Sequence, residues 1–150
     1  MTCYDKAVSL LAAREHTEKE LRSKLQTRGY GREEISEAVG RLLREGYLSE
    51  ERFAESFIRS RLRRSPEGRS LLMMRLMEKG SPRAVASAAV SSAWDDGLYI
   101  EPLRRYASAL SARKGREGAA AALLRKGFTP AEIDAALEAA ADEAEGLDIE

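Results

Sequence analysis

Arginine is concentrated in one short stretch of this 150-residue chain. Four arginines fall within six residues and two more follow, and the six are Arg59, Arg61, Arg63, Arg64, Arg69 and Arg75. The planar guanidinium group can donate paired hydrogen bonds to phosphate and carboxylate groups. A helix dipole accounts for one or two basic residues at a helix end, but not for four. We therefore predict that these six residues bind a nucleic acid or an acidic partner, and the alternative is a solvated helix face.

Charge is unevenly distributed along the chain, although the formal net charge is zero. Residues 128–150 contain eight Asp and Glu residues and no Lys or Arg, so residues 1–127 carry the balancing +8. A basic body followed by an acidic end indicates contact with a polyanion, or with a protein that binds one.

The residue types that usually perform catalysis or bind metals are scarce. The chain has one histidine, His16, and one cysteine, Cys3, and the residues after His16 do not form the His-Glu-x-x-His zinc motif. No glycine-rich dinucleotide or phosphate-binding loop and no nucleophile elbow is present. We therefore expect no enzyme activity, no metal and no cofactor, and we interpret His16 as a surface or packing residue.

The cellular setting follows from what the sequence lacks. A single cysteine cannot form an internal disulfide, no run of eighteen apolar residues is present, and residues 1–6 do not begin a signal peptide. We expect a cytoplasmic protein that makes no contact with a membrane.

The positioning elements are short helices that recur three times. Apolar residues lie eight and four positions before Gly29, Gly80 and Gly127, and a second apolar helix follows each glycine. Thr17 and Thr129 each precede a glutamate by three residues, as in a capping box. A repeat of about fifty residues indicates stacked modules that act as a surface.

These signals predict an all-α protein of three tandem three-helix repeats that form an elongated, curved array. The repeats are expected at 1–48, 49–95 and 96–143, with an acidic C-terminal tail at 144–150. The nine predicted helices span 4–15, 17–28, 32–45, 50–64, 68–79, 82–94, 101–114, 116–126 and 130–143. Helices this short are marginal in isolation, so neighbouring repeats should pack on one another.

Several segments of the chain resemble the RecX family of regulatory proteins. The segments are 14–17 (REHT), 46–54 (GYLSEERFA), 79–80 (KG) and 125–128 (RKGF). The resemblance covers nearly the whole chain, and the segment from 46 to 61 is its most specific part. It implies a modulator of the RecA recombinase that acts in DNA repair, homologous recombination and the SOS response. Such proteins bind in the groove of the RecA–single-stranded DNA filament and usually inhibit its recombinase, ATPase and coprotease activities.

The implied partners are the RecA filament and single-stranded DNA, with weak binding of duplex DNA. A monomer is the simplest state, because the repeats already supply several contact faces. Two other functions stay open. A direct duplex-DNA binder would use 32–45 as its recognition helix, but four acids against three arginines there argue against base readout. A helical adaptor would make no contact with nucleic acid.

Overall fold

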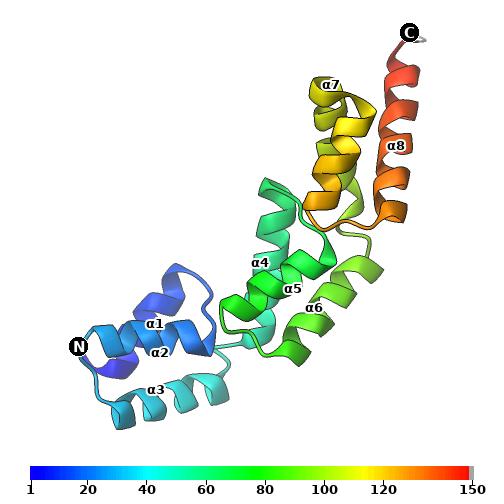
Figure 1. Cartoon of the computed structure of the whole chain (residues 1–150). Helices are drawn as coiled ribbons and strands as arrows, with labels where there is room; N and C mark the ends of the chain where they lie inside the picture. The colour runs from blue at the N-terminus through cyan, green and yellow to red at the C-terminus, as the bar shows by residue number, and fades with distance from the viewer. Residues whose placement is uncertain (149–150) are drawn as a thin grey trace. The chain divides into compact units, whose positions relative to one another are not determined.

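The described part of the chain is entirely helical. The computed structural model describes the backbone of residues 1–148 and the side-chain surroundings of residues 1–146. Over residues 1–148 the chain forms α-helices joined by turns, without a strand, as predicted (Figure 1). None of these helices is long and apolar enough to cross a bilayer. The helices are α1 (Cys3–Ala13), α2 (Glu18–Thr27), α3 (Arg32–Glu45), α4 (Glu50–Arg64), α5 (Arg69–Glu78), α6 (Arg83–Asp95), α7 (Ile100–Arg125) and α8 (Pro130–Asp148).

Capping residues set the helix starts. Thr17 Oγ1 accepts from the Glu20 amide at 3.0 Å, and Glu20 Oε1 accepts from the Thr17 amide at 3.2 Å, which completes the predicted capping box before α2. Thr129 and Glu132 repeat the arrangement at the start of α8, at 3.2 and 2.8 Å. The α3 helix ends at Gly46, whose φ of 79° is a left-handed conformation that glycine adopts without strain.

The predicted helix break at Gly115 is confirmed, whereas the predicted end of the last helix differs from the structure. The predicted helices 101–114 and 116–126 appear as α7, which is interrupted at Gly115 by a φ of 75° and a ψ of 172°. The ribbon of α7 reverses direction there, so α7 is two helical segments (Figure 1). The α8 helix runs to Asp148 instead of ending at 143, because its alanine and glutamate residues favour a helix. The predicted acidic tail is therefore helical over 144–148, and residues 149 and 150 lie outside the described residues.

The chain divides into two compact units. The first contains Met1–Phe57 and Arg75–Ala89, and the second contains Ile58–Met74 and the residues from Val90 onward. Residues of the predicted middle repeat, 49–95, are thus shared between both units. The three repeat boundaries stay a prediction.

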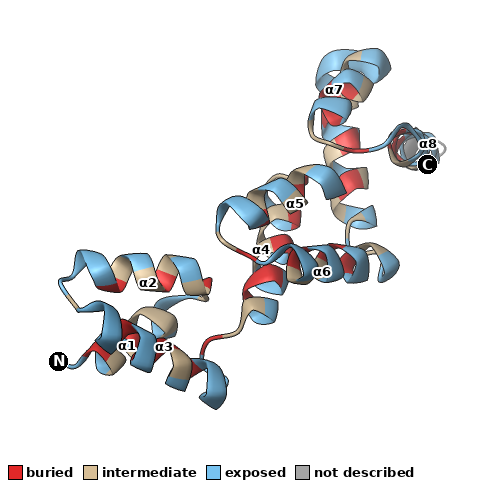
Figure 2. Cartoon of the chain, turned by 60° about the horizontal axis from the view of Figure 1, so that its bottom comes forward, coloured by how far each residue is buried: buried red, intermediate tan, exposed pale blue. Residues whose placement is uncertain are grey.

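The core of the first unit lies between α1, α2 and α3. Its buried residues are Cys3, Ala7, Leu21, Leu25, Ile35, Ala38, Val39, Leu42 and Leu48. Leu21 and Leu25 lie one helical turn apart, and both are fully buried, as the repeat pattern predicts. Buried residues face inward between these three helices (Figure 2). Burying each leucine contributes roughly 2 kcal/mol, which three short helices need because they are marginal alone.

The second unit has its core between the two segments of α7 and α8. The buried residues are Leu103, Ala107, Leu110, Ala119, Ala122, Leu123, Phe128, Ile133, Ala136 and Leu137. Trp94 stacks on Tyr99 with ring centroids 4.5 Å apart and 6° between their planes. Its indole Nε1 donates to Glu132 Oε2 at 2.5 Å. This contact fixes the turn that leads into α7 against the first turns of α8.

In each unit, the lysine carbonyl of a lysine–glycine turn accepts a hydrogen bond from a segment distant in the sequence. In the first unit, Thr17 Oγ1 donates to the Lys79 carbonyl at 2.7 Å. In the second, the Gly68 amide donates to the Lys126 carbonyl at 2.8 Å. A Cβ on Gly68 would lie 2.0 Å from the Gly127 carbonyl oxygen, so this close approach requires glycine.

Candidate nucleic-acid interface

The periodicity of α4 decides which arginines lie together. Ile58 and Leu62 are buried and one turn apart, so they define the face of α4 that packs inward. Arg59 and Arg63 follow them by one position each and are exposed. Residues four apart lie on the same side of a helix, so these two guanidinium groups share one face.

A pocket of about 620 Å³ lies beside this face, within the second unit. Four arginines line it: Arg59, Arg63 and Arg64 from α4, and Arg105 from α7. The other lining residues are apolar or aromatic, and they are Leu62, Pro66, Leu98, Pro102, Tyr106 and Ala109. No acidic side chain of the described residues lines the pocket.

The α4 arginines of the pocket keep their charge uncompensated. Among the residues that the structure describes, Arg59, Arg63 and Arg64 form no ion pair. Arg105 does, since its Nε lies 3.3 Å from Glu101 Oε1. Neighbouring like charges without acids repel one another, and a bound anion relieves that repulsion. The pocket is therefore suited to an anionic ligand.

Glu101 stays ionised at neutral pH. Hydrogen bonds from Arg104 and Arg105 lower the pKa of this exposed carboxyl to about 2. Glu101 thus offsets part of the positive charge of α7, whereas the α4 arginines retain theirs. The α4 side of the pocket is the stronger anion site.

Three of the six predicted site residues do not line this pocket. The Nε of Arg61 lies 3.8 Å from Glu67 Oε1, and only 1% of Glu67 is exposed. Arg69 and Arg75, on α5, are also absent from the lining. Arg61 differs from Arg59 and Arg63 because a step of two residues turns the side chain to another side of a helix. Proximity in the sequence grouped all six residues, whereas only Arg59, Arg63 and Arg64 among them line the pocket.

Among the pocket residues that sequence reasoning missed, Arg105 and Tyr106 on α7 are the ones that offer a charge or an aromatic ring to a ligand. The run Arg104-Arg105-Tyr106 combines basic and aromatic residues and was the signal that could have found them. Arg104 itself is bonded to Glu101 and Glu143.

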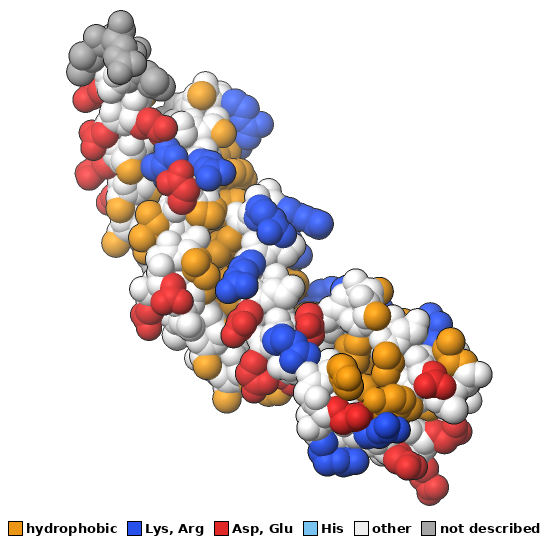
Figure 3. All heavy atoms as spheres, turned by 180° about the vertical axis from the view of Figure 1, so that it is seen from behind, with side chains coloured by type: hydrophobic (Ala, Val, Ile, Leu, Met, Phe, Trp, Pro, Cys, Tyr) orange, Lys and Arg blue, Asp and Glu red, His pale blue; other side chains and the backbone are white. Residues whose placement is uncertain are grey.

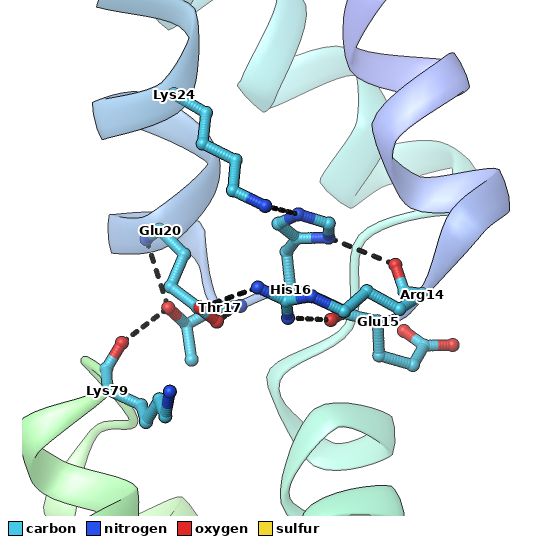
Figure 4. Close-up of polar contacts among 7 residues, drawn as sticks. All are labelled: Arg14, Glu15, His16, Thr17, Glu20, Lys24 and Lys79. Atoms are coloured by element: carbon cyan, nitrogen blue, oxygen red, sulfur yellow. Dashed lines mark hydrogen bonds and ion pairs between the residues drawn. The ribbon is translucent and has the colours of Figure 1, made fainter. Parts of the chain in front are cut away.

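His16 is a packing residue. It is 1% exposed, its Nδ1 lies 3.0 Å from the Arg14 carbonyl oxygen, and its Nε2 lies 2.8 Å from Lys24 Nζ (Figure 4). A lysine ammonium only donates, so Nε2 accepts and Nδ1 carries the proton. Burial lowers the pKa of His16, and the charges of Arg14 and Lys24 lower it further. A neutral, buried imidazole with both nitrogens bonded is structural.

Over the residues that the structure describes, no group of three or more His, Cys, Asp or Glu side chains is arranged to hold a metal ion. On the face shown in Figure 3, acidic side chains gather near the C-terminal end of the chain, and further acidic side chains are interspersed with Lys and Arg over the rest of the face.

Comparison with known proteins agrees with the fold and with the resemblance. Models of the first and the second three-helix domains of RecX match residues 3–42 and 49–90. The regulatory protein RecX of Halorhodospira halophila is 37% identical over 143 residues, which cover 93% of this chain and 88% of the relative. The regulatory protein RecX of Chlorobaculum tepidum is 39% identical over 87 residues, which cover 58% of this chain and 54% of the relative.

A solved structure extends the agreement to most of the fold. The crystal structure of RecX from Lactobacillus salivarius superposes with a TM-score of 0.77 at 25% identity, over 91% of this chain and 92% of that one. The two matched models describe three-helix domains in tandem, which is the repeat that the glycine-ended helices predict. The chain belongs to the RecX family of regulatory proteins.

Proposed function

We propose that this protein binds the RecA–single-stranded DNA filament and inhibits its recombinase, ATPase and coprotease activities during DNA repair. The single observation that carries the proposal is the pocket in which Arg59, Arg63 and Arg64 lie together without an acidic partner. In a chain of a regulatory family, such a pocket supports binding rather than catalysis. Action on chromosomal DNA would place the protein in the cytoplasm.

Phosphate is the anion that a nucleoprotein filament offers in repeated copies. Hydrogen bonds between guanidinium groups and phosphate are charge-assisted and are roughly twice as strong as neutral ones. A filament also presents identical protein surfaces at regular intervals, so modest contacts from several helical units add through effective concentration. A monomer with several contact faces can therefore bind tightly although each contact is weak.

ATP hydrolysis by RecA on single-stranded DNA provides the functional test. We expect inhibition at amounts of this protein well below one per RecA subunit, because a protein that blocks filament growth acts at few positions. Binding is compared in parallel on RecA-coated single strand, bare single strand and bare duplex. The protein should bind more tightly to the RecA-coated single strand than to either bare DNA. Tightest binding to duplex would indicate a direct duplex binder, and binding to RecA without DNA would indicate an adaptor.

Charge reversal tests the role of the pocket in the same assay. The triple variant Arg59→Glu, Arg63→Glu and Arg64→Glu should lose inhibition, because it replaces the phosphate-binding charges with repelling ones. A matched control carries Arg32→Glu, Arg44→Glu and Arg83→Glu, which are exposed positions outside the pocket. If the folded pocket variant inhibits as well as the wild type, the pocket is not where the filament binds.

A further inference from the structure

We propose that the arginine pocket accepts one unstacked nucleotide base, with the neighbouring phosphates on its arginine rim. The protein would then select single-stranded over duplex nucleic acid at this site. The inference rests on the proposed function, because the same arginines hold the phosphates. It adds that a base of the ligand fills the space between these arginines.

The lining of the pocket is more apolar than an anion site requires. Six of its ten lining residues are apolar or aromatic, among them Leu62, Leu98 and Tyr106. A phosphate placed against such walls loses hydration without gaining hydrogen bonds. A volume of about 620 Å³ also lies within the range of sites that enclose small organic ligands. A ligand that matches both the arginines and the apolar lining carries negative charge beside a flat, largely apolar group, as a nucleotide does.

Tyr106 supplies an aromatic surface for stacking. It is half-buried beside the core of the second unit, and Lys126 Nζ lies 5.7 Å from its ring centroid. Bases of single strands stack on aromatic rings and on guanidinium planes, and both are present in this pocket. Stacking on an aromatic side chain contributes roughly 1–3 kcal/mol for each base and depends little on sequence.

The walls on two sides of the pocket are fixed by hydrogen bonds. Leu98 is 41% exposed, yet its turn is held by a bond from its amide to the Ala93 carbonyl at 3.0 Å. Beside Pro66, Lys126 Nζ donates to Ser65 Oγ at 2.5 Å. Preformed walls lower the entropic cost of binding, because the ligand does not have to order them.

Duplex DNA cannot fill this pocket in the same way. Its bases are paired and stacked, and extruding one costs a few kcal/mol. An acidic peptide would satisfy the arginines, but its carboxylate side chains offer no flat ring for the apolar lining. The combination of arginines and apolar lining residues therefore favours an extended single strand.

The test compares ligands that share phosphates and differ in bases. Fluorescence anisotropy measures binding of the 150-residue protein to a labelled twelve-nucleotide dT strand, to an abasic strand of equal length, and to a duplex of that length. We expect the dT strand to bind about tenfold more tightly than the abasic strand, which corresponds to about 1.4 kcal/mol. Equal affinity for the dT and abasic strands would overturn the inference.

Two variants locate the effect. Tyr106→Leu keeps an apolar wall and removes the ring, so it should weaken dT binding about tenfold and leave abasic binding unchanged. Ala109→Asp places a negative charge on the exposed pocket wall and should weaken both. Ala121→Asp is its control, since Ala121 is exposed on α7 outside the pocket. Circular dichroism checks that each variant keeps the helical content of the wild type.

Parallel measurement of RecA inhibition separates this inference from the proposed function. Inhibition by a wild-type protein that binds dT and abasic strands equally would overturn only the nucleotide site. If Ala109→Asp weakens filament binding without changing bare-strand binding, the pocket holds an acidic protein surface and the inference is wrong. A wild-type protein that neither binds nor inhibits the filament would overturn the proposed function as well.

Discussion

Replacing Arg59, Arg63 and Arg64 with glutamine removes three charges from the pocket and keeps side chains of high helix propensity. The three side chains are exposed and form no ion pair within the described residues. The free energy of unfolding should therefore change by about 0.5 kcal/mol or less. Binding, in contrast, should lose its strong dependence on salt.

The magnitude follows from counterion release. Each phosphate neutralised on a single strand adds about 0.7 to the slope of log affinity against log salt. Three lost contacts should flatten that slope by about 2. Between 50 and 200 mM salt, the wild type should then lose about 20-fold more affinity than the triple variant.

The assay is anisotropy of a labelled dT strand at several salt concentrations across this range. The control carries Arg32→Gln, Arg44→Gln and Arg83→Gln, which remove the same net charge at exposed positions outside the pocket. Its slope should equal that of the wild type. An unchanged slope in a folded pocket variant would refute the assignment of these arginines to phosphate.

Three further predictions concern stability, measured by urea unfolding. Gly68→Ala should lower the free energy of unfolding by about 3 kcal/mol, because its Cβ would lie 2.0 Å from the Gly127 carbonyl oxygen. Thr17→Ala should cost about 1–2 kcal/mol through the lost helix cap and the lost bond to the lysine–glycine turn. His16 should make the free energy of unfolding depend on pH. Burial lowers the native pKa of His16 below its unfolded value of about 6.5, so the native state favours the neutral imidazole. This contribution to stability is complete above pH 6.5 and is lost as the pH falls from there toward the native pKa. The loss should be at most about 1.4 kcal/mol for each pH unit, because unfolding takes up at most one proton at this single imidazole.

The controls for these variants come from the same chain. Gly146→Ala introduces a Cβ into open space and should leave the urea midpoint unchanged or slightly higher. A midpoint of Gly68→Ala equal to that of the wild type would contradict the close approach of the two backbones. His16→Gln should remove the pH dependence that the wild type shows between pH 7 and 5.5. If His16→Gln retains it, other groups titrate there.

Local chemistry made most helix boundaries predictable. Thr17 with Glu20 and the left-handed Gly46 act within a few residues of one another, so their effect is readable from the sequence. The end of α8 was not predicted, because the acids beyond 143 were interpreted as a tail although Ala144, Glu145 and Leu147 favour a helix. Acidic composition outweighed helix propensity in that interpretation.

The site was only partly predictable. The arginine cluster in the sequence contains three lining residues, Arg59, Arg63 and Arg64, but it also contains Arg61, which lies against the buried Glu67. Arg105 joins the pocket from another helix, about forty residues away. Pairing between helices depends on how α4 and α7 pack, and no local pattern records that packing.

The sequence by itself determined the all-α class, the capped and glycine-ended helices, and the excess of arginine near residue 60, because each depends on contacts within one or two helical turns. Only the tertiary structure decided which arginines share a pocket, that apolar side chains and Tyr106 line it with them, and that Gly68 must be glycine. Those features require segments distant in the chain to meet. The physical reason is that side-chain direction is local, whereas the neighbour that a side chain meets is set by the packing of the whole unit.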